Sequence, residues 1–474
     1  MTIKLYNTLT RKLEEFKPLV PGHVGFYSCG PTVYHYTHLG NLRTFLHNDF
    51  LKRMFLANGY DVRHIMNITD VGHLTNDEDD SGEDKMEKGA ARDNKSVWDI
   101  ARFYKDEFMR DFNDLNMIAP TVMPHATDYI AEQIELVQKL QDLGYTYEIP
   151  NDGIYYDTSK FAGYGALTGG SLSGNRAGAR VGFNDAKRNP TDFALWKFSP
   201  TDVKRQMEWD SPWGVGFPGW HAECSAMSMK LLGNHFDIHT GGEDLSRVHH
   251  ANEIAQSEPI TGAPWVNTWL HYSFLLDKSG EKMAKSKGEF LGLESVRKRG
   301  YDPMVYRYFV ALGHYQSQLA FSWETMDASA NGYANLVRRV ADLIVANDGT
   351  VDSAAYDAWH EKMLTAMSDN LKTAAVLVHV QDFVKSNEIN GATKLALVRF
   401  ADDLLGLQFI DRAQKLVDLE RESAPAEIVA LAESRATAKA NRDWATADAL
   451  RAEIDAAGWT VLDGKDGYKI VKKV

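Results

Sequence analysis

Residues 26–45 read FYSCGPTVYHYTHLGNLRTF, and this stretch decides the fold class. Its first residues are short, apolar and aromatic, which predicts a strand over residues 23–28. A glycine and a proline then break the strand. From Leu42 onward apolar side chains recur at the spacing of one helix face, which predicts a helix over residues 42–57. A strand, a turn and a helix in this order open a nucleotide-binding α/β domain, whose helix start offers free N–H groups to an anion.

The start of this helix carries polar residues in place of a glycine-rich phosphate loop. His38 and Asn41 can donate hydrogen bonds there, and Gly40 lets a ligand approach the backbone closely. The residues alone leave a plainer alternative open, in which His38 is an ordinary helix-start residue and Asn41 a cap.

The composition is that of an ordinary globular protein. The chain has 474 residues, of which 44% are hydrophobic and 25% charged, and its length predicts about three domains. No apolar run approaches the ~20 residues of a membrane span, and residues 1–7 lack the apolar core of a signal peptide. We therefore expect a cytoplasmic protein. A net charge of −13 argues against non-specific coating of nucleic acid, although local basic patches could still bind one.

The remaining strands of the predicted sheet also end in polar or glycine-rich turns. A strand over residues 60–69 ends near Thr69, and a strand over residues 235–239 leads to Gly241, Gly242, Glu243 and Asp244. Open α/β sheets bind ligands at the carboxyl ends of their strands, so these turns are candidate binding positions. The acidic residues 76–84 are interpreted as a solvated surface loop.

The chain has two cysteines, Cys29 and Cys224, and a disulfide between them is not expected in the cytoplasm. Both fall at predicted turns or helix starts on the edge of the sheet that also receives His249 and Glu253. These last two are four residues apart and so share one helix face. Two thiolates, an imidazole and a carboxylate would suit Zn²⁺. Spacing alone favours the alternative of two core cysteines, and it does not choose between His249 and His250.

Residues 280–288 read GEKMAKSKG, a basic loop between glycines. For a lysine-rich loop taken by itself, a solvated charge run is the usual interpretation.

Taken together, two motifs change that interpretation. The stretch around His38 resembles the His-Ile-Gly-His motif of class I aminoacyl-tRNA synthetases, with Leu39 and Asn41 as departures from it. With residues 29–34 (CGPTVY) in front of it, it is similar to the version in the cysteinyl-tRNA synthetase family. The basic loop resembles the second class I motif, Lys-Met-Ser-Lys-Ser, with Ala284 in place of the first serine. The resemblance runs from about residue 5 to the end of the chain.

The resemblance implies an α/β fold, with a Rossmann-type parallel-sheet catalytic domain split by a connective insertion and followed by an α-helical bundle and a small C-terminal domain. The expected boundaries are 1–117 for the first half of the catalytic domain, 118–200 for the insertion, 201–270 for the second half, 271–324 for a stem-contact region, 325–420 for an anticodon-binding bundle and 425–474 for the C-terminal domain. The insertion is short for a hydrolytic editing domain, which would need ~100 residues.

The resemblance also implies the site residues. The zinc ligands map onto Cys29, Cys224, His249 and Glu253. Residues around ATP, which binds with Mg²⁺, map onto His38, Gly40, Asn41, Gly241, Gly242, Lys282 and Lys285. Of these, His38, Asn41, Lys282 and Lys285 would be catalytic. Residues around bound cysteine map onto Gly30, Thr69, Trp220 and Asp244.

The implied reaction is ATP-dependent activation of L-cysteine and its transfer to tRNA(Cys), by a chain that we expect to be a monomer. Two alternatives stay open. One is a ligase that joins cysteine to an amino sugar on the same catalytic core, although such relatives lack a long helical C-terminal part. The other is an inactive tRNA-binding paralogue, for which Asn41 and Ala284 are the only hints.

Overall fold

The computed structural model describes residues 1–72, 74–76, 81–169, 186–201, 204–277, 280, 290–346, 348–421, 424–464 and 467–473. The chain divides into two compact units. The first comprises residues 1–330, 361–378 and 403–407, and the second comprises 331–360, 379–402 and 408–474.

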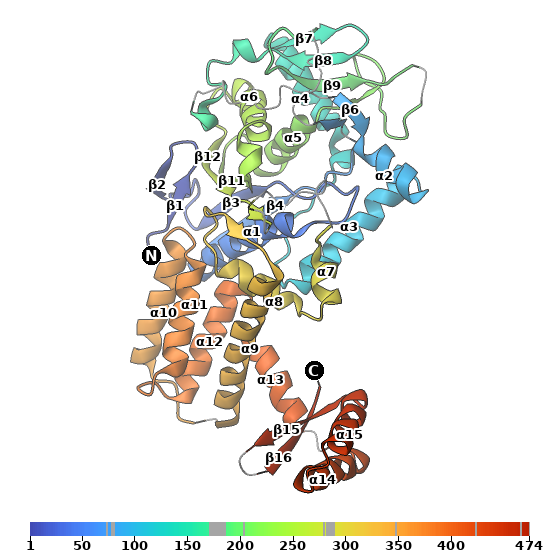
Figure 1. Ribbon diagram of the computed structural model, residues 1–474. Coiled ribbons are helices and arrows are strands. Elements are labelled where there is room, and N and C mark those ends of the chain that lie inside the picture. Colours follow the sequence, from blue (N-terminus) through green and yellow to red (C-terminus); the bar gives the residue numbers. More distant parts are fainter. Residues whose placement is uncertain are drawn as a thin grey trace. The chain divides into compact units, whose positions relative to one another are not determined.

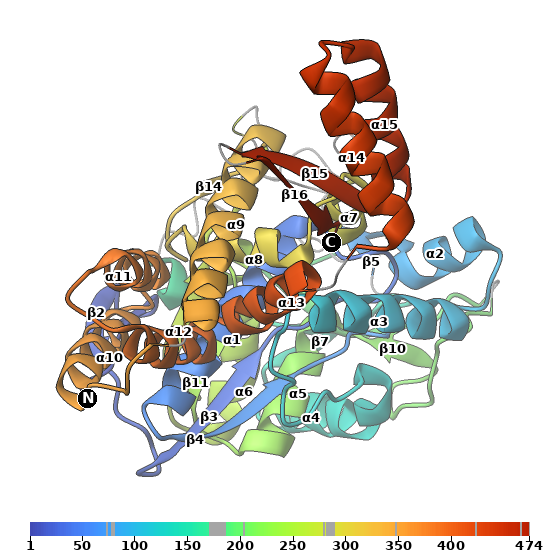
Figure 2. The same ribbon diagram turned by 90° about the horizontal axis from the view of Figure 1, so that it is seen from below.

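A four-stranded parallel sheet forms the centre of the first unit, in the order β12-β11-β3-β4 (Figure 1). Its strands are β3 (His23–Ser28), β4 (Asp61–Met66), β11 (Phe236–Gly242) and β12 (Val266–Tyr272). Figure 1 shows helix α1 (Leu39–Ala57) on one face of this sheet, with α5 (Trp220–Leu232) and α6 (His249–Thr261) on the other. Figure 2 views the molecule from the side of α1. The predicted α/β class is therefore confirmed.

Helix α1 follows β3 as the sequence predicts and begins three residues earlier than its apolar pattern. The helix residues predicted to face inward are all buried, namely Leu42, Phe45, Leu46, Phe50 and Met54. The helix ends at Asn58, and Gly59 follows with a φ of 80°, a left-handed conformation that favours glycine.

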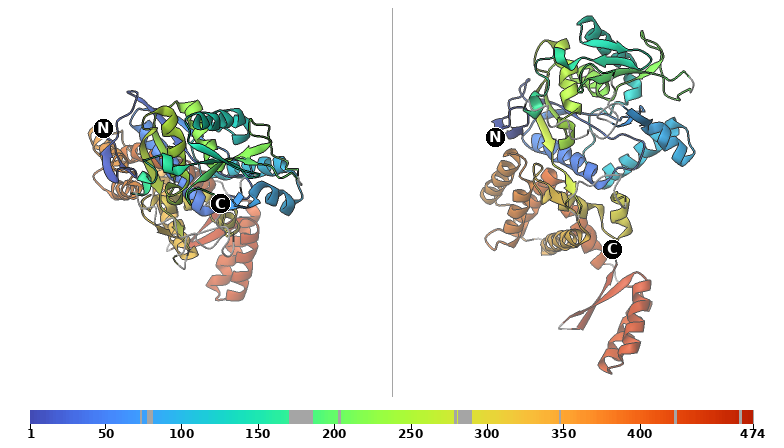
Figure 3. Two further views of the ribbon diagram at one scale, coloured as in Figure 1. Left: turned by 90° about the horizontal axis from the view of Figure 1, so that it is seen from above. Right: turned by 45° about the horizontal axis from the view of Figure 1, so that its top comes forward.

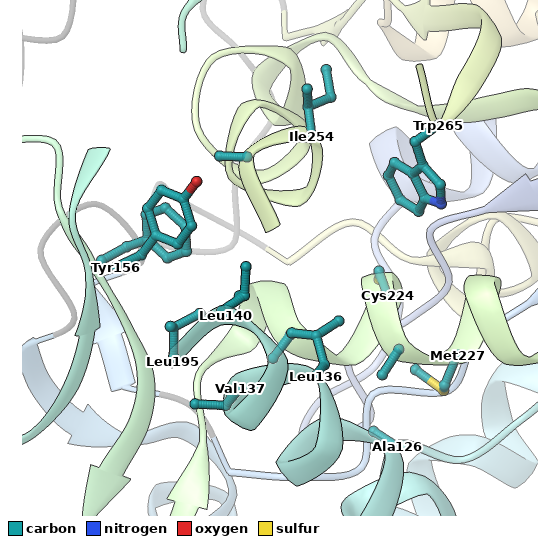
Figure 4. Packing of buried hydrophobic residues seen from close by; sticks show 14 of the residues in the cluster. Ala126, Leu136, Val137, Leu140, Tyr156, Leu195, Cys224, Met227, Ile254 and Trp265 are labelled. Atoms are coloured by element: carbon teal, nitrogen blue, oxygen red, sulfur yellow. The ribbon is translucent and has the colours of Figure 1, made fainter. Parts of the chain in front are cut away.

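An antiparallel sheet in the order β10-β9-β8-β7 lies between the two halves of the parallel sheet in sequence. Its strands are β7 (Thr146–Ile149), β8 (Gly153–Tyr156), β9 (Phe193–Phe198) and β10 (Gly216–Pro218). The fourth strand comes after residue 200, so this sheet takes in a segment beyond the expected insertion. Helix α4 (Ile130–Asp142), α5 and α6 share one large apolar core with it (Figure 4).

The acidic stretch 76–84 is not simply a surface loop. Residues 77–80 lie outside the described part, but β5 (Leu74–Asn76) and β6 (Ser81–Asp84) pair as antiparallel strands. Asp84 is buried and caps helix α2 (Lys85–Asp93), accepting hydrogen bonds from Met86 N at 2.7 Å and Glu87 N at 3.0 Å. Composition alone predicted a solvated loop, and this cap overrides it for Asp84.

The other elements of the first unit are β1 (Lys4–Asn7), β2 (Lys12–Glu15), α3 (Val97–Asp114), β13 (Leu275–Leu276), α7 (Leu293–Lys298), α8 (Pro303–Ala311) and β14 (Leu319–Ala320). Four longer helices, α9 (Trp323–Ala346), α10 (Ser353–Ser368), α11 (Thr373–Lys385) and α12 (Gly391–Leu405), run through both units in sequence. Among the described residues no helix is long and apolar enough to cross a membrane.

The second unit is helical except for its end. The rings of Trp359 and Phe383 pack at 5.9 Å and those of His360 and Phe400 at 3.9 Å, which holds the helices of a bundle together. Helix α13 (Phe409–Arg421) precedes a small core made by α14 (Ala426–Ala440), α15 (Trp444–Ala456), β15 (Trp459–Gly464) and β16 (Gly467–Lys472). The two strands pair as an antiparallel hairpin, drawn in red in Figure 3 beside the two helices.

Candidate active site and metal centre

The carboxyl ends of β3, β4 and β11 and the N-termini of α1, α5 and α6 surround one cavity of about 270 Å³. This is the edge of the sheet at which open α/β folds bind ligands. Eleven of the sequence-predicted site residues line it, namely Cys29, Gly30, His38, Gly40, Asn41, Thr69, Trp220, Cys224, Gly242, Asp244 and His249. Lys282 and Lys285 lie outside the described residues.

His38 forms the N-terminus of α1. It is extended (φ −81°, ψ 160°), and its Nδ1 accepts a hydrogen bond from Asn41 N at 3.2 Å. A Cβ on Gly40 would lie 3.0 Å from the His38 ring, so a side chain there would crowd the imidazole. The cap thus satisfies one N–H of the first turn and fixes His38 at the cavity.

Gly30 and Thr69 are held by one hydrogen-bonded chain. Gly30 N donates to Asn67 Oδ1 at 2.8 Å, and a Cβ on Gly30 would lie only 1.7 Å from Asn67 O, so no other residue fits there. The Asn67 amide donates to Thr69 Oγ1 at 2.9 Å, and that hydroxyl donates to Glu223 Oε2 at 3.0 Å. The turn after β3 and the end of β4 therefore form one rigid wall of the cavity.

The backbone at the carboxyl end of β11 is also closely packed. A Cβ on Gly241 would lie 2.7 Å from both His250 Cε1 and Leu245 Cδ1, and one on Gly242 would lie 2.6 Å from Asp244 Oδ1. Gly242 faces the cavity, whereas Gly241 is buried behind it. A side chain at Gly241 would thus press on His250 and Leu245, and one at Gly242 would displace the carboxylate of Asp244, which itself lines the cavity.

At the base of the cavity, Cys29, Cys224, His249 and Glu253 each offer a ligand atom within 4.8 Å of the other three. Cys29 follows β3, Cys224 lies in the second turn of α5, and the other two share a face of α6. Figure 4 shows Cys224 among the buried apolar side chains of this region. The structure also offers a second grouping, with His239 and His250 in place of Cys224 and His249.

Glu253 and His249 form a buried ion pair within this cluster. Burial raises the pKa of the Glu253 carboxyl, but His239 and His249 outweigh burial and bring that pKa to about 2. Burial lowers the pKa of His249, yet Glu253 and Cys224 raise it to about 10. His249 Nε2 lies 2.8 Å from Glu253 Oε1, so an imidazolium faces a carboxylate in the dry interior.

Four further histidines surround the cluster. His221 Nδ1 lies 2.8 Å from His249 Nδ1, and His239 Nε2 lies 2.7 Å from Glu253 Oε2. His250 is held between Cys29 Sγ at 3.3 Å and His271 Nε2 at 2.8 Å. Contacts of this kind orient metal ligands in proteins. His249 faces the cavity, whereas His250 lies behind Cys29.

The donor set fits Zn²⁺. Two thiols, an imidazole and a carboxylate are ligand types that zinc takes. Their ligand atoms lie within 4.8 Å of one another, so all four could contact one ion. Because the cluster also opens into the cavity, an ion held there would be within reach of a bound ligand.

Comparison with known proteins places the chain in a family. Residues 15–331 match the family described as tRNA synthetases class I (C) catalytic domain. The chain is 46% identical to cysteine–tRNA ligase 1 of Burkholderia lata over 99% of this chain and 97% of that one. It is 44% identical to the cysteine–tRNA ligase of Treponema denticola over the whole of both chains. The chain belongs to the cysteine–tRNA ligase family.

Structural comparison supports the class I fold. The structure is similar to Mycobacterium tuberculosis methionyl-tRNA synthetase in complex with methionyl-adenylate, with a TM-score of 0.57 over 85% of this chain and 94% of that chain. The two are 16% identical, so this likeness shows the fold alone. The cysteine–tRNA ligase relatives carry the family assignment, and they include the helical C-terminal part of the chain.

For this member of the cysteine–tRNA ligase family, sequence reasoning missed three kinds of site residue. It did not select His221 and His239, which contact His249 and Glu253, or Asn67, which holds Gly30 and Thr69. It also missed Lys85, which lines the cavity. The sequence placed Asn67 at the end of a predicted strand, where ligands bind, but gave it no role, and nothing local distinguishes Lys85 from its neighbours.

Proposed function

We propose that this chain activates L-cysteine with ATP and transfers it to tRNA(Cys) in the cavity at the carboxyl edge of the parallel sheet. The observation that carries the proposal is that Cys29, Cys224, His249 and Glu253 converge within 4.8 Å at the base of the cavity whose other end is the start of α1. A thiol-selecting group and a phosphate-binding helix start therefore face the same space.

Zinc held by these four residues would supply a soft Lewis acid that takes the substrate thiolate far more readily than a hydroxyl. A synthetase for cysteine must reject serine, which differs from it by one atom, and shape alone discriminates weakly at that scale. Cys29, Cys224, His249 and Glu253 would hold the ion, while His221 and His239 fix the orientation of His249 and Glu253.

The walls of the cavity position the rest of the amino acid. Asp244 is the natural partner for its ammonium group, and Trp220 bounds the space beside His249, with ring centroids 4.2 Å apart. Gly30 and Thr69, fixed through Asn67, form a further part of the cavity wall. With its sulfur and ammonium held, the substrate's carboxylate has a defined direction.

The reaction is attack of that carboxylate on the α-phosphorus of ATP with release of pyrophosphate, followed by transfer of the aminoacyl group to a 3′-terminal hydroxyl of the tRNA. It requires no protein nucleophile, so catalysis rests on positioning and on cations placed where phosphate charge develops. His38 and Asn41 would bind the phosphates at the start of α1, and Gly40 and the glycines after β11 would admit the nucleotide. Lys282 and Lys285 would bind the pyrophosphate, with Mg²⁺ accompanying the ATP.

An amino-sugar ligase is the alternative on the same core, and the full-length similarity to cysteine–tRNA ligases disfavours it. The two activities differ in product: the tRNA ligase makes an RNase-sensitive cysteinyl product, and the other enzyme makes a small amide.

The test is ATP–pyrophosphate exchange by the zinc-loaded protein with L-cysteine or L-serine, followed by transfer of labelled cysteine to tRNA. We expect pyrophosphate exchange with cysteine and an RNase-sensitive product. Exchange with serine should be lower by a factor on the order of 1000 or more, because a site that bonds one substrate group strongly rejects the analogue that lacks it. Absence of cysteine-dependent exchange, or equal exchange with serine, would contradict the proposal.

A further inference from the structure

The cavity contains a cation that no step above uses. Lys85 lines it, and within the described lining it is the one lysine or arginine side chain. Its Nζ lies 5.5 Å from the centroid of the Trp220 ring. Because that ring packs at 4.2 Å against His249, Lys85 lies toward the end of the cavity that holds the candidate zinc ligands, here called the metal cluster.

The position of Lys85 is built by its neighbours. It is the first residue of α2, and the preceding Asp84 accepts the N–H groups of Met86 and Glu87 and forms an ion pair with Arg205. A Cβ on Gly72 would lie 2.1 Å from Asp84 Oδ2, so this carboxylate packs directly against the backbone of Gly72. The start of α2 is thereby fixed.

The same network reaches Trp220. The guanidinium carbon of Arg205 lies 3.7 Å from the centroid of the Phe217 ring, and Phe217 belongs to β10, which leads through Gly219 into α5. A Cβ on Gly219 would lie 2.0 Å from Ala194 O, so the chain between Phe217 and Trp220 is packed tightly. One set of contacts therefore places both the lysine and the indole that it faces.

A free amino acid such as cysteine presents three polar groups. The metal cluster suits the sulfur, and the Asp244 carboxylate suits the ammonium, which leaves the α-carboxylate to be paired in a partly dry cavity. We propose that Lys85 binds the α-carboxylate of the incoming cysteine and so completes a three-point recognition of the substrate. This inference rests on the proposed function and adds a specificity-determining residue to it.

The plainer alternative is that the lysine stem only covers the indole ring, as long charged side chains often do. Lys85→Met separates the two ideas, because methionine keeps the apolar stem over Trp220 and removes the charge. Lys88→Met is the matched control, since Lys88 is exposed on the same helix and does not line the cavity.

The experiment measures equilibrium binding of L-cysteine and of cysteamine, which lacks the carboxylate, to the zinc-loaded full-length protein by calorimetry. We expect Lys85→Met to weaken cysteine binding about 10- to 100-fold, as loss of a charge-assisted hydrogen bond does. Cysteamine binding should stay within about twofold, because the amine has no group for Lys85 to bind. Lys85→Arg should recover part of the cysteine affinity, and Lys88→Met should match the unaltered protein for both ligands.

Two results would overturn the inference while leaving the proposed function intact. They are unchanged cysteine binding by Lys85→Met and equal loss of affinity for cysteine and cysteamine. If the unaltered zinc-loaded protein binds neither thiol, the proposed function fails first and this inference falls with it.

Discussion

The pKa values of Cys29 and Cys224 are shifted in opposite directions although both thiols belong to one cluster. Burial raises the pKa of the Cys29 thiol, and the neighbouring Cys224 raises it further. A hydrogen bond from Cys29 lowers the pKa of Cys224, and His249 adds to this against the opposing effect of burial. Of the two thiols, Cys224 therefore loses its proton more readily, and both must be deprotonated to bind a metal ion.

Replacement of Cys224 by serine tests the metal centre at this scale. Cys224→Ser removes one soft ligand, and we expect zinc content to fall from one ion per chain to well below stoichiometric, with loss of cysteine affinity. Elemental analysis after dialysis measures the zinc. The control is Ser225→Ala, which alters the next residue of α5, where the buried hydroxyl has no hydrogen-bond partner among the described residues. Stoichiometric zinc in Cys224→Ser would show that the ligand set is wrong.

At the scale of elements, local patterns predicted much of the secondary structure around the cavity, whereas the roles of the site residues came from the family resemblance and stay predictions. The apolar periodicity after Gly40 gave α1, and the strand-end glycines gave the turn after β11, because both signals depend on neighbours in sequence. Asp84 was misjudged because the acidic composition hid its local cap contacts with the N–H groups of Met86 and Glu87. Its ion pair with Arg205, 121 positions away, is a contact that no window of sequence contains. His239 and Lys85 were missed for the same reason, since their roles depend on which elements the fold brings together.

The contact between helix α1 and the segment that follows strand β12 can be tested directly. The buried Arg43 guanidinium donates to four carbonyl oxygens, those of Ser273, Phe274, His314 and Ser317. Ser273 and Phe274 line the same cavity as His38. The hydroxyl of Ser273 also donates to Glu243 Oε2 at 2.7 Å, so Arg43 braces the segment beside Asp244.

Arg43→Met should therefore destabilise the protein by about 2–5 kcal/mol, because four carbonyl groups lose a buried donor. The measurement is the denaturant midpoint of unfolding, together with the KM for ATP. Arg63→Met provides the control, since Arg63 is exposed and donates one hydrogen bond, at 3.2 Å to Leu231 O. Similar midpoints for the two variants would mean that Arg43 does not hold these segments together.

At the scale of the whole molecule, one buried ion cluster ties together four distant segments of the first unit. Asp49 on α1 accepts from Arg53 Nε at 2.7 Å, pairs with Arg307 on α8, and accepts from Ile118 N at 2.7 Å. Arg307 also donates to Leu115 O and Leu405 O, each at 2.6 Å. Helix α1, the segment after α3, α8 and the end of α12 are thus linked through a single carboxylate.

The charge of the Asp49 carboxylate determines how the stability contributed by this ion cluster depends on pH. Burial raises the pKa of Asp49, but Arg307 and Arg53 outweigh burial and hold the pKa below its usual value of 3.8. Because the folded-state pKa is lower than the unfolded one, Asp49 stabilises the fold above pH 3.8 and loses this effect as pH falls through the folded-state pKa.

Asp49→Asn should cost about 3–5 kcal/mol near neutral pH, since it leaves two buried guanidinium groups without a counter-charge. The difference in unfolding free energy from the unaltered protein should be constant between about pH 5 and 7 and shrink in more acidic solution. Denaturant unfolding at a series of pH values measures it. Asp61→Asn is the control, because Asp61 is exposed and pairs with His23 at 3.0 Å, an interaction worth less than about 1 kcal/mol. If the two variants shift the midpoint equally, or if the Asp49→Asn difference persists undiminished in acid, the ion cluster does not hold these segments in place.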